Sequence, residues 1–166
     1  MNKSFQISID TGGTFTDCMA TDNFGNEYRT KILSNSTIRG EVIERISGKI
    51  FKIKQSWQLK RDILKDYLFL VLGHSFNSKV ISFDVENSIL KIKDNLPELF
   101  EHQIFSFALT ANEEAPILGA RLITETSLQE QFPDIQMRIG STKGTNALLE
   151  LKGAKTAFVV TKGFKD

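Results

Sequence analysis

The feature that most constrains the fold is a segment near the start of the chain, SIDTGGTFTD at 8–17, where two adjacent glycines interrupt an alternating pattern. Before the glycines, residues 5–9 alternate apolar and polar side chains, which is the period of a half-buried β-strand. After them an apolar run resumes at 18–20, and a second turn at 23–26 precedes the segment 27–33. The pattern predicts a meander of three strands with the glycine pair in its first turn.

The segment from residue 113 to the end is predicted to alternate helix and strand. Acidic residues and a proline at 113–116 are typical of a helix N-terminus, and apolar residues follow them at helical spacing. Residues 135–139 alternate as a strand, and 146–152 are predicted to form a short helix that Gly153 ends at its C-cap. The apolar run 157–160 is predicted to be a buried strand, central or parallel in its sheet.

The middle of the chain, about residues 36–110, differs in composition and carries no motif that we can place. β-branched residues are frequent over 42–53, where Gly48 interrupts them. Charged residues interleave with apolar ones over 57–72, which predicts a helix there. Further strands are predicted at 79–83, 89–92 and 104–109. We interpret residues 36–110 as a β-rich insertion.

Without the insertion, the predicted order is strand, strand, strand, helix, strand, helix, strand. This is the α/β topology of one lobe of an actin-like (ribonuclease H-like) ATPase with a mixed sheet. We therefore expect residues 1–35 and 111–166 to form an N-terminal lobe of this kind, interrupted by 36–110. In such lobes the first hairpin presents its turn to the phosphates of ATP.

Composition restricts the class of partner more than it restricts the fold. The 166 residues include 21 Lys and Arg and 20 Asp and Glu, and the net charge of +1 predicts no nucleic-acid partner. No apolar run is long enough for a signal peptide or a membrane span. The lone Cys18 excludes an internal disulfide and, within an apolar strand, is expected to be a buried structural thiol. We expect a cytoplasmic protein with no membrane partner, and a chain that is a fragment of a longer one.

The first turn has the residues of a phosphate-binding loop. Glycines let backbone N–H groups approach an anion, and they tolerate the positive φ of a tight anion-binding turn. The N–H groups of Gly12, Gly13 and Thr14 are the candidate donors, and the hydroxyls of Thr11 and Thr14 can add hydrogen bonds. Asp10 ends the strand and is the candidate ligand of Mg²⁺, directly or through water. The alternative is that the glycine pair only makes a hairpin turn.

A second polar cluster lies where the later strand meets the short helix. Residues 140–142 end the strand, and residues 144–146 open the helix. Strand ends and helix N-termini line ligand clefts in open α/β sheets, so Thr142, Thr145 and Asn146 are candidate contacts of a phosphate or a substrate. The alternative is that Thr145 or Asn146 only caps the helix.

These segments also carry a family resemblance. IDTGGTFTD at 9–17 resembles the N-terminal signature of the hydantoinase/oxoprolinase family, whose relatives include ATP-dependent ketone carboxylase subunits. RIGSTKGTNALLELKGAKTAFVVTKGFKD at 138–166 is similar to the second signature of the family. The helical segment EEAPILGARLITET at 113–126 is similar to the oxoprolinase-like branch. Ser141 stands where many relatives have threonine, a difference that keeps the hydroxyl.

The resemblance implies an enzyme that uses ATP and Mg²⁺ to activate the amide carbonyl of a small cyclic lactam or imide, whose ring water then opens. It implies a catalytic and metal-binding role for Asp10. The implied contacts of the nucleotide are Thr11, Gly12, Gly13, Thr14, Thr142 and Asn146. It also implies a second lobe of the same enzyme, with or without a second subunit, so the isolated chain is expected to be inactive.

Two other kinds of function stay open on the residues alone. The same hairpin suits an actin-like lobe of a small-molecule kinase, or of a carboxylase subunit that phosphorylates an enolate. A non-enzymatic assembly module centred on residues 36–110 is the third hypothesis. ATP consumption over a panel of substrates separates the enzymes from one another, whereas a protein partner lost on deletion of 36–110 supports the module.

Overall fold

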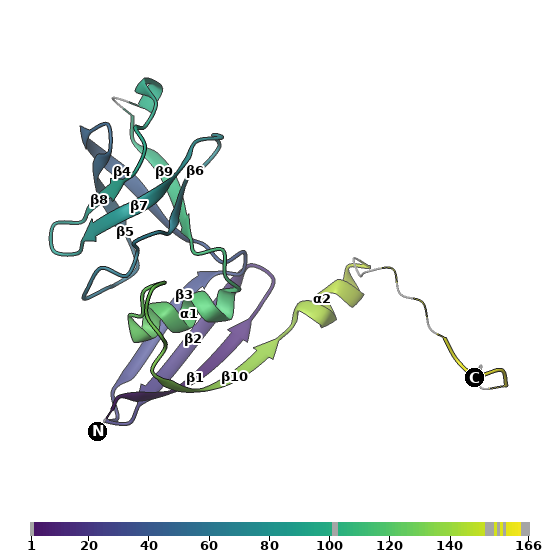
Figure 1. Ribbon diagram of the computed structural model, residues 1–166. Helices are drawn as coiled ribbons and strands as arrows, with labels where there is room; N and C mark the ends of the chain where they lie inside the picture. The colour runs from purple at the N-terminus through teal and green to yellow at the C-terminus, as the bar shows by residue number, and fades with distance from the viewer. Residues whose placement is uncertain (1, 101–102, 152–154, 156, 158, 164–166) are drawn as a thin grey trace.

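The computed structural model describes residues 2–100, 103–151, 155, 157 and 159–163. The chain forms a four-stranded sheet and a closed barrel of six strands, with one helix lying between them (Figure 1). In the chain, the barrel lies between the third strand of the sheet and this helix.

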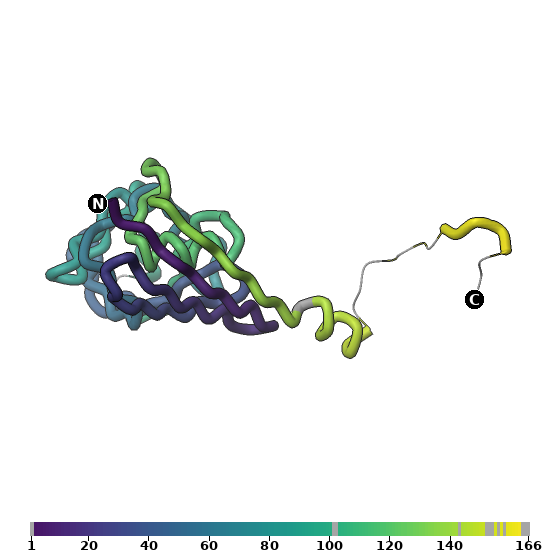
Figure 2. The backbone as a smooth tube through the Cα atoms, turned by 90° about the horizontal axis from the view of Figure 1, so that it is seen from below, coloured from purple at the N-terminus to yellow at the C-terminus, as the bar shows by residue number. Residues whose placement is uncertain are grey.

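The sheet has the strand order β10-β1-β2-β3. Its strands are β1 (Ser4–Thr11), β2 (Phe15–Asp22), β3 (Glu27–Leu33) and β10 (Asp134–Ser141). The first three form the antiparallel meander that the glycine pattern predicts, and β10 is parallel to β1. Figure 2 shows β1 and β10 side by side although they are far apart in the sequence. Buried and exposed residues alternate along β1 and β2, so one face of the sheet is covered and the other is open.

The barrel has the strand order β4-β5-β8-β7-β6-β9, and every neighbouring pair is antiparallel. Its strands are β4 (Ile38–Ser47), β5 (Ile50–Gln55), β6 (Leu68–Val71), β7 (Asn77–Asp84), β8 (Ile89–Ile92) and β9 (Phe105–Thr110), and a short 3-10 helix, η1 (Glu98–Phe100), precedes β9. The strands predicted at 79–83, 89–92 and 104–109 are confirmed as β7, β8 and β9. Because the sheet closes on itself, its strands have no free edge.

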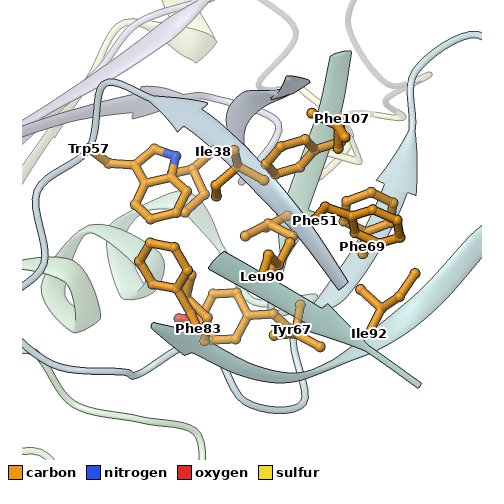
Figure 3. Packing of buried hydrophobic residues seen from close by; sticks show 14 of the residues in the cluster. Ile38, Phe51, Trp57, Tyr67, Phe69, Phe83, Leu90, Ile92 and Phe107 are labelled. Carbon is orange, nitrogen blue, oxygen red and sulfur yellow. The ribbon is translucent and has the colours of Figure 1, made fainter. Parts of the chain in front are cut away.

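Aromatic side chains fill the barrel. Phe69 stacks on Phe51 and on Phe107, with ring centroids 6.3 and 5.0 Å apart. Trp57 meets Phe83 edge to face at 5.2 Å between centroids (Figure 3), and its indole N–H donates to the carbonyl of Arg39 at 3.1 Å. The barrel interior is therefore a packed hydrophobic core.

The helix predicted over 57–72 is wrong. The residues before β6 form an irregular connection in which Ile63 and Leu64 are nevertheless fully buried. The carboxylate of Asp62 accepts the backbone N–H of Leu64 at 2.9 Å and that of Phe83 at 2.8 Å. A short polar side chain that bonds the local backbone competes with helical hydrogen bonds, and the second bond ties this connection to β7.

The helix α1 (Ala115–Thr124) packs against both the barrel and the sheet (Figure 1). Its predicted start is confirmed, since Glu114 is the N-cap and a proline lies in the first turn. Leu118 and Leu122 belong to the hydrophobic cluster of the barrel, whereas Ile123 belongs to the cluster formed with β1 and β2. One short helix therefore joins the two hydrophobic cores.

Polar contacts hold the connection before β6 against the segment after α1. The Arg61 side chain donates to the carbonyl of Glu125 at 2.9 Å and pairs with the carboxylate of Glu130. The backbone N–H of Ser127 also donates to Glu130, at 2.8 Å. The hydrogen bonds from Ser127, together with Arg61, lower the pKa of Glu130 to about 2. Near them, the buried Arg121 forms a two-pronged ion pair with Glu113, at 2.6 and 2.8 Å.

The helix α2 (Lys143–Leu149) projects from the end of β10, away from the sheet and the barrel (Figure 2). It begins earlier than the predicted 146, with Thr142 as its N-cap, and it ends at Leu149 with Glu150 as its C-cap, so the predicted extent to 152 is wrong. Gly153, the predicted C-cap, lies outside the described residues. Of the strand predicted at 157–160, residues 157, 159 and 160 are described; they are exposed and belong to no strand, so the prediction is wrong there. An apolar run forms a buried strand only where a sheet edge accepts its backbone bonds, and these residues lie away from the sheet (Figure 1).

No helix in the described ranges is both long and apolar enough to cross a bilayer.

Candidate functional site

The glycine turn joins β1 to β2 at one end of the sheet. The N–H of Gly12 donates to the carbonyl of Phe15 at 2.9 Å, so this group closes the turn and is not the free phosphate donor that was predicted. Over the described ranges no hydrogen bond uses the N–H of Gly13 or of Thr14, and both residues are exposed. Neither glycine has a positive φ. The turn therefore offers two available donors, the N–H groups of Gly13 and Thr14, without the left-handed geometry that was expected.

Ser34, which was not among the sequence-based candidates, holds this turn from the end of β3. Its hydroxyl donates to the carbonyl of Gly12 at 2.9 Å and lies 3.0 Å from the hydroxyl of Thr16. Its backbone N–H donates to the carbonyl of Thr14 at 2.9 Å. Because β3 is antiparallel to β2, its last residues must lie beside the start of β2. The sequence therefore contained a signal for this contact, namely a hydroxyl residue immediately after the third strand of the meander.

The two polar clusters of the sequence meet at this end of the sheet. The N–H of Thr142 donates to the carbonyl of Thr11 at 3.2 Å. The side-chain amide of Asn146 lies 3.5 Å from the position that a Cβ on Gly13 would occupy. Thr142 is the N-cap of α2 without a side-chain cap bond, and Thr145 and Asn146 lie inside the helix. The alternative that Thr145 or Asn146 only caps the helix is therefore wrong.

Asp10 and Thr11 are neighbours in β1 and so point to opposite faces of the sheet. Asp10 is exposed on the open face, opposite Asp17 of β2, whose carboxylate pairs with Lys31 at 3.3 Å. These three residues line a cavity of about 820 Å³, together with Arg29, Arg138 and other residues of the four strands of the sheet. Thr11 is 3% exposed and lies on the covered face. The predicted site residues are thus divided between two faces that share the glycine turn.

The open face suits a hydrated divalent cation. Asp10 and Asp17 are cross-strand partners, and both present carboxylate oxygens, which Mg²⁺ prefers. In the part of the chain that the structure describes, no cluster of three or more His, Cys, Asp or Glu side chains forms a complete metal site. Mg²⁺ commonly takes one or two carboxylates and completes its shell with water and phosphate oxygens. Asp10 and Asp17 are therefore the residues of this face that could hold such a cation.

Cys18 is buried on the covered face, as expected of a structural thiol. Burial raises the pKa of its thiol to about 12, and the nearby Asp17 adds to the shift, so the thiol stays protonated and unreactive at neutral pH. A Cβ added to Gly119 of α1 would lie 2.3 Å from the Cys18 Sγ. The absence of a side chain at Gly119 therefore lets α1 lie close to Cys18 and to the sheet.

Residues 91–166 match the family model described as the hydantoinase/oxoprolinase N-terminal region. The chain is 44% identical over 63 residues to 5-oxoprolinase 1 of Arabidopsis thaliana, a match that covers 32% of this chain and 5% of that protein. It is 31% identical over 97 residues to an uncharacterized protein of Schizosaccharomyces pombe, a match that covers 53% of this chain and 7% of that protein. The chain therefore spans only a small part of the length of these curated relatives. No solved structure matches it.

The family match includes the helical segment 113–126 and the second signature at 138–166, both of which carry the resemblance. In the structure these residues supply α1, the last part of β10 and α2. Thr142 and Asn146, which contact or adjoin the glycine turn, lie within the match. The match over residues 91–166 thereby confirms the resemblance to the N-terminal region of the hydantoinase/oxoprolinase family.

Proposed function

We propose that this chain is the phosphate-binding part of an ATP-dependent hydrolase that opens a small cyclic lactam or imide. The observation that carries the proposal is the hydrogen bond from the Thr142 N–H to the Thr11 carbonyl, at 3.2 Å. It joins the glycine turn to the start of α2, so that the two signature segments form one surface. The family match over 91–166 and a 5-oxoprolinase among the relatives support the class of reaction.

The residues of this surface have distinct roles in the proposal. In the proposal, the N–H groups of Gly13 and Thr14 donate to phosphate oxygens, and the Asn146 amide and the Thr142 hydroxyl assist them. Asp10 holds Mg²⁺ directly or through water, with Asp17 opposite it on the open face. When bound, ATP supplies the phosphoryl group that activates the amide carbonyl, and Mg²⁺ neutralises charge on the phosphates.

We also propose that the sheet belongs to an actin-like lobe made of residues 1–35 and 111–166, with 36–110 inserted. The strand order β10-β1-β2-β3, with an antiparallel meander and a parallel fourth strand, supports this. A second lobe of the same enzyme, with or without a second subunit, would cover the turn, which is exposed here. The isolated chain is then inactive. The buried thiol of Cys18 agrees with the cytoplasmic location that we propose.

The variant Asp10→Ala in the complete enzyme tests this function. We expect ATP consumption that depends on a cyclic amide to fall about a hundredfold or more, because the charge that organises the metal is lost. The thermal midpoint should stay the same, since Asp10 is exposed. Asp134→Ala is the matched control, because it removes an exposed carboxylate at the other end of the neighbouring strand. Normal turnover in Asp10→Ala contradicts the assignment.

The turn itself does not distinguish a lactam hydrolase from a small-molecule kinase or a carboxylase subunit, since each needs the same phosphate donors. A panel of cyclic amides, sugars, short acids and ketones with the complete enzyme makes the distinction. We expect ATP consumption with cyclic amides and ring-opened products. Stimulation by a ketone in the presence of bicarbonate would instead assign the chain to a carboxylase.

A further inference from the structure

We infer that a second cavity, on the α1 side of the glycine turn, binds the ring of an uncharged cyclic amide; this inference rests on the proposed function. The cavity has a volume of about 320 Å³ and lies between the ends of β1 and β10 and the first turn of α1. It is lined by Thr11, Glu114, Pro116, Ile117, Ile139 and Ser141. Thr11 directly precedes Gly12, so a molecule held here lies beside the turn that the proposal assigns to phosphate.

The hydroxyl of Thr11 is the observation that points to a ligand. The residue is 3% exposed, and its Oγ1 has no hydrogen-bond partner among the residues that the structure describes. Buried polar side chains nearly always have a partner, because leaving one unpaired costs stability. Strand alternation turns this side chain toward α1, the side on which the cavity lies, and Thr11 is one of the residues that line it. A polar atom of a bound molecule would supply the missing partner.

The walls of the cavity indicate what kind of molecule fits. Pro116, Ile117 and Ile139 present apolar surface, which suits a small ring. Glu114 is the N-cap of α1, and its exposed carboxylate makes no side-chain cap bond. A donor from Thr11 and an acceptor from Glu114 match the carbonyl and the N–H of one amide group. The volume lies at the small end of ligand pockets, which favours a single ring.

The charge of the lining selects against an anionic ring. The six lining residues include the Glu114 carboxylate and no basic side chain. A carboxylate on the ring would lie near Glu114, and none of the six lining residues carries a positive charge to compensate it. Like charges at close range disfavour binding. The cavity therefore favours an uncharged lactam or imide over a ring that carries a carboxylate.

Binding of two probes to the whole chain tests the cavity without any need for turnover. The probes are 2-pyrrolidone, which is uncharged, and 5-oxoproline, the same ring with a carboxylate; binding is followed by saturation-transfer NMR and calorimetry. We expect 2-pyrrolidone to bind more tightly. Thr11→Val, which replaces the hydroxyl by a methyl group, should weaken that binding about tenfold, and Thr11→Ser should keep it.

Ser36→Ala is the matched control, because Ser36 also has a buried hydroxyl that lacks a partner within the described ranges, but it does not line the cavity. This variant should leave the affinity for 2-pyrrolidone unchanged. Glu114→Gln should raise the affinity for 5-oxoproline about tenfold by removing the repulsive charge. The inference is overturned if the wild-type chain does not bind 2-pyrrolidone, if it prefers 5-oxoproline, or if Thr11→Val has no effect.

The complete enzyme separates failure of this inference from failure of the proposed function. If no cyclic amide stimulates ATP consumption, the proposed function fails, whatever the probes show in binding. If cyclic amides do stimulate it, Thr11→Val should raise the KM for the amide and leave the KM for ATP near its original value. A rise in the KM for ATP alone would keep the proposed function and overturn the inference, since Thr11 would then serve the nucleotide.

Discussion

The barrel and the four-stranded sheet use their strands differently. In the barrel, all strands pair on both sides, and the side chains of Phe51, Phe69 and Phe107 fill the interior. In the sheet, α1 covers one face, and the other face exposes Asp10 and its cross-strand partner Asp17. Closing a sheet satisfies its edges and leaves little room for polar chemistry, whereas an open sheet keeps a turn and a face free for ligands. We expect this difference in packing to show in how much stability each region loses when a single methyl group is added.

The largest effect is expected for Gly40→Ala in the barrel. A Cβ at this position would lie 2.6 Å from the ring of Phe107 and 3.0 Å from the carbonyl of Lys54. We expect the free energy of unfolding to fall by about 3 kcal/mol, because a packed ring and a paired strand would both have to move. Urea denaturation measures the loss. Adding Phe107→Leu should restore only part of it, since the Lys54 carbonyl stays; full recovery would mean that the barrel is less rigid than its packing indicates.

A smaller effect, which a second substitution should relieve, is expected for Gly119→Ala, where α1 meets the sheet. The new Cβ would lie 2.3 Å from the Sγ of Cys18 but 3.5 Å from its Cβ. We expect a loss of about 2 kcal/mol from Gly119→Ala, measured by the same denaturation. The double variant Cys18→Ala/Gly119→Ala should be more stable than Gly119→Ala alone, because the clashing sulfur is gone. A double variant as unstable as the sum of the two single variants would contradict this packing.

The smallest effect on stability is expected at the glycine turn. Ser34→Ala removes the hydroxyl that donates to the Gly12 carbonyl, and we expect a loss of about 1 kcal/mol. The change should be local, so hydrogen exchange of the bonded Gly12 and Ser34 amides should accelerate while the barrel amides keep their protection. Ser36→Ala is the control, because it removes from the same connection a hydroxyl that has no partner in the part of the chain that the structure describes. Equal exchange in the two variants would show that Ser34 does not hold the turn.

Local patterns predicted the sheet well and the middle of the chain less well. The meander, β10 and the start of α1 follow from alternation and turn chemistry that lie within a few residues. The helix predicted at 57–72 failed because its apolar spacing fits a buried loop equally well. The hydrogen bond that ties this loop to β7, from the N–H of Phe83 to the Asp62 carboxylate, joins residues 21 positions apart, and no pattern within a few residues of Asp62 predicts it. Closure of the barrel depends on such distant pairings, and the sequence predicted only that residues 36–110 are rich in β-strands.

The candidate site shows the same limit. Asp10, the glycine turn and the segment 140–146 could be placed together, since parallel strands end at the same edge of a sheet. The use of the Gly12 N–H within the turn could not be read from the sequence, because glycine permits several turn geometries. The same holds for the cavity beside Thr11, whose walls come from β1, β10 and α1.

The pairing of β1 with β10 has a consequence for the order of folding. Every strand pair of the barrel falls within residues 38–110, whereas the bond from Ser141 to Thr11 joins residues 130 positions apart. Contacts between distant residues form late, because the intervening chain must first be ordered. As the chain leaves the ribosome, the barrel can fold before β10 has been synthesised. The surface that the two signatures share is therefore assembled last, on a barrel that is already complete.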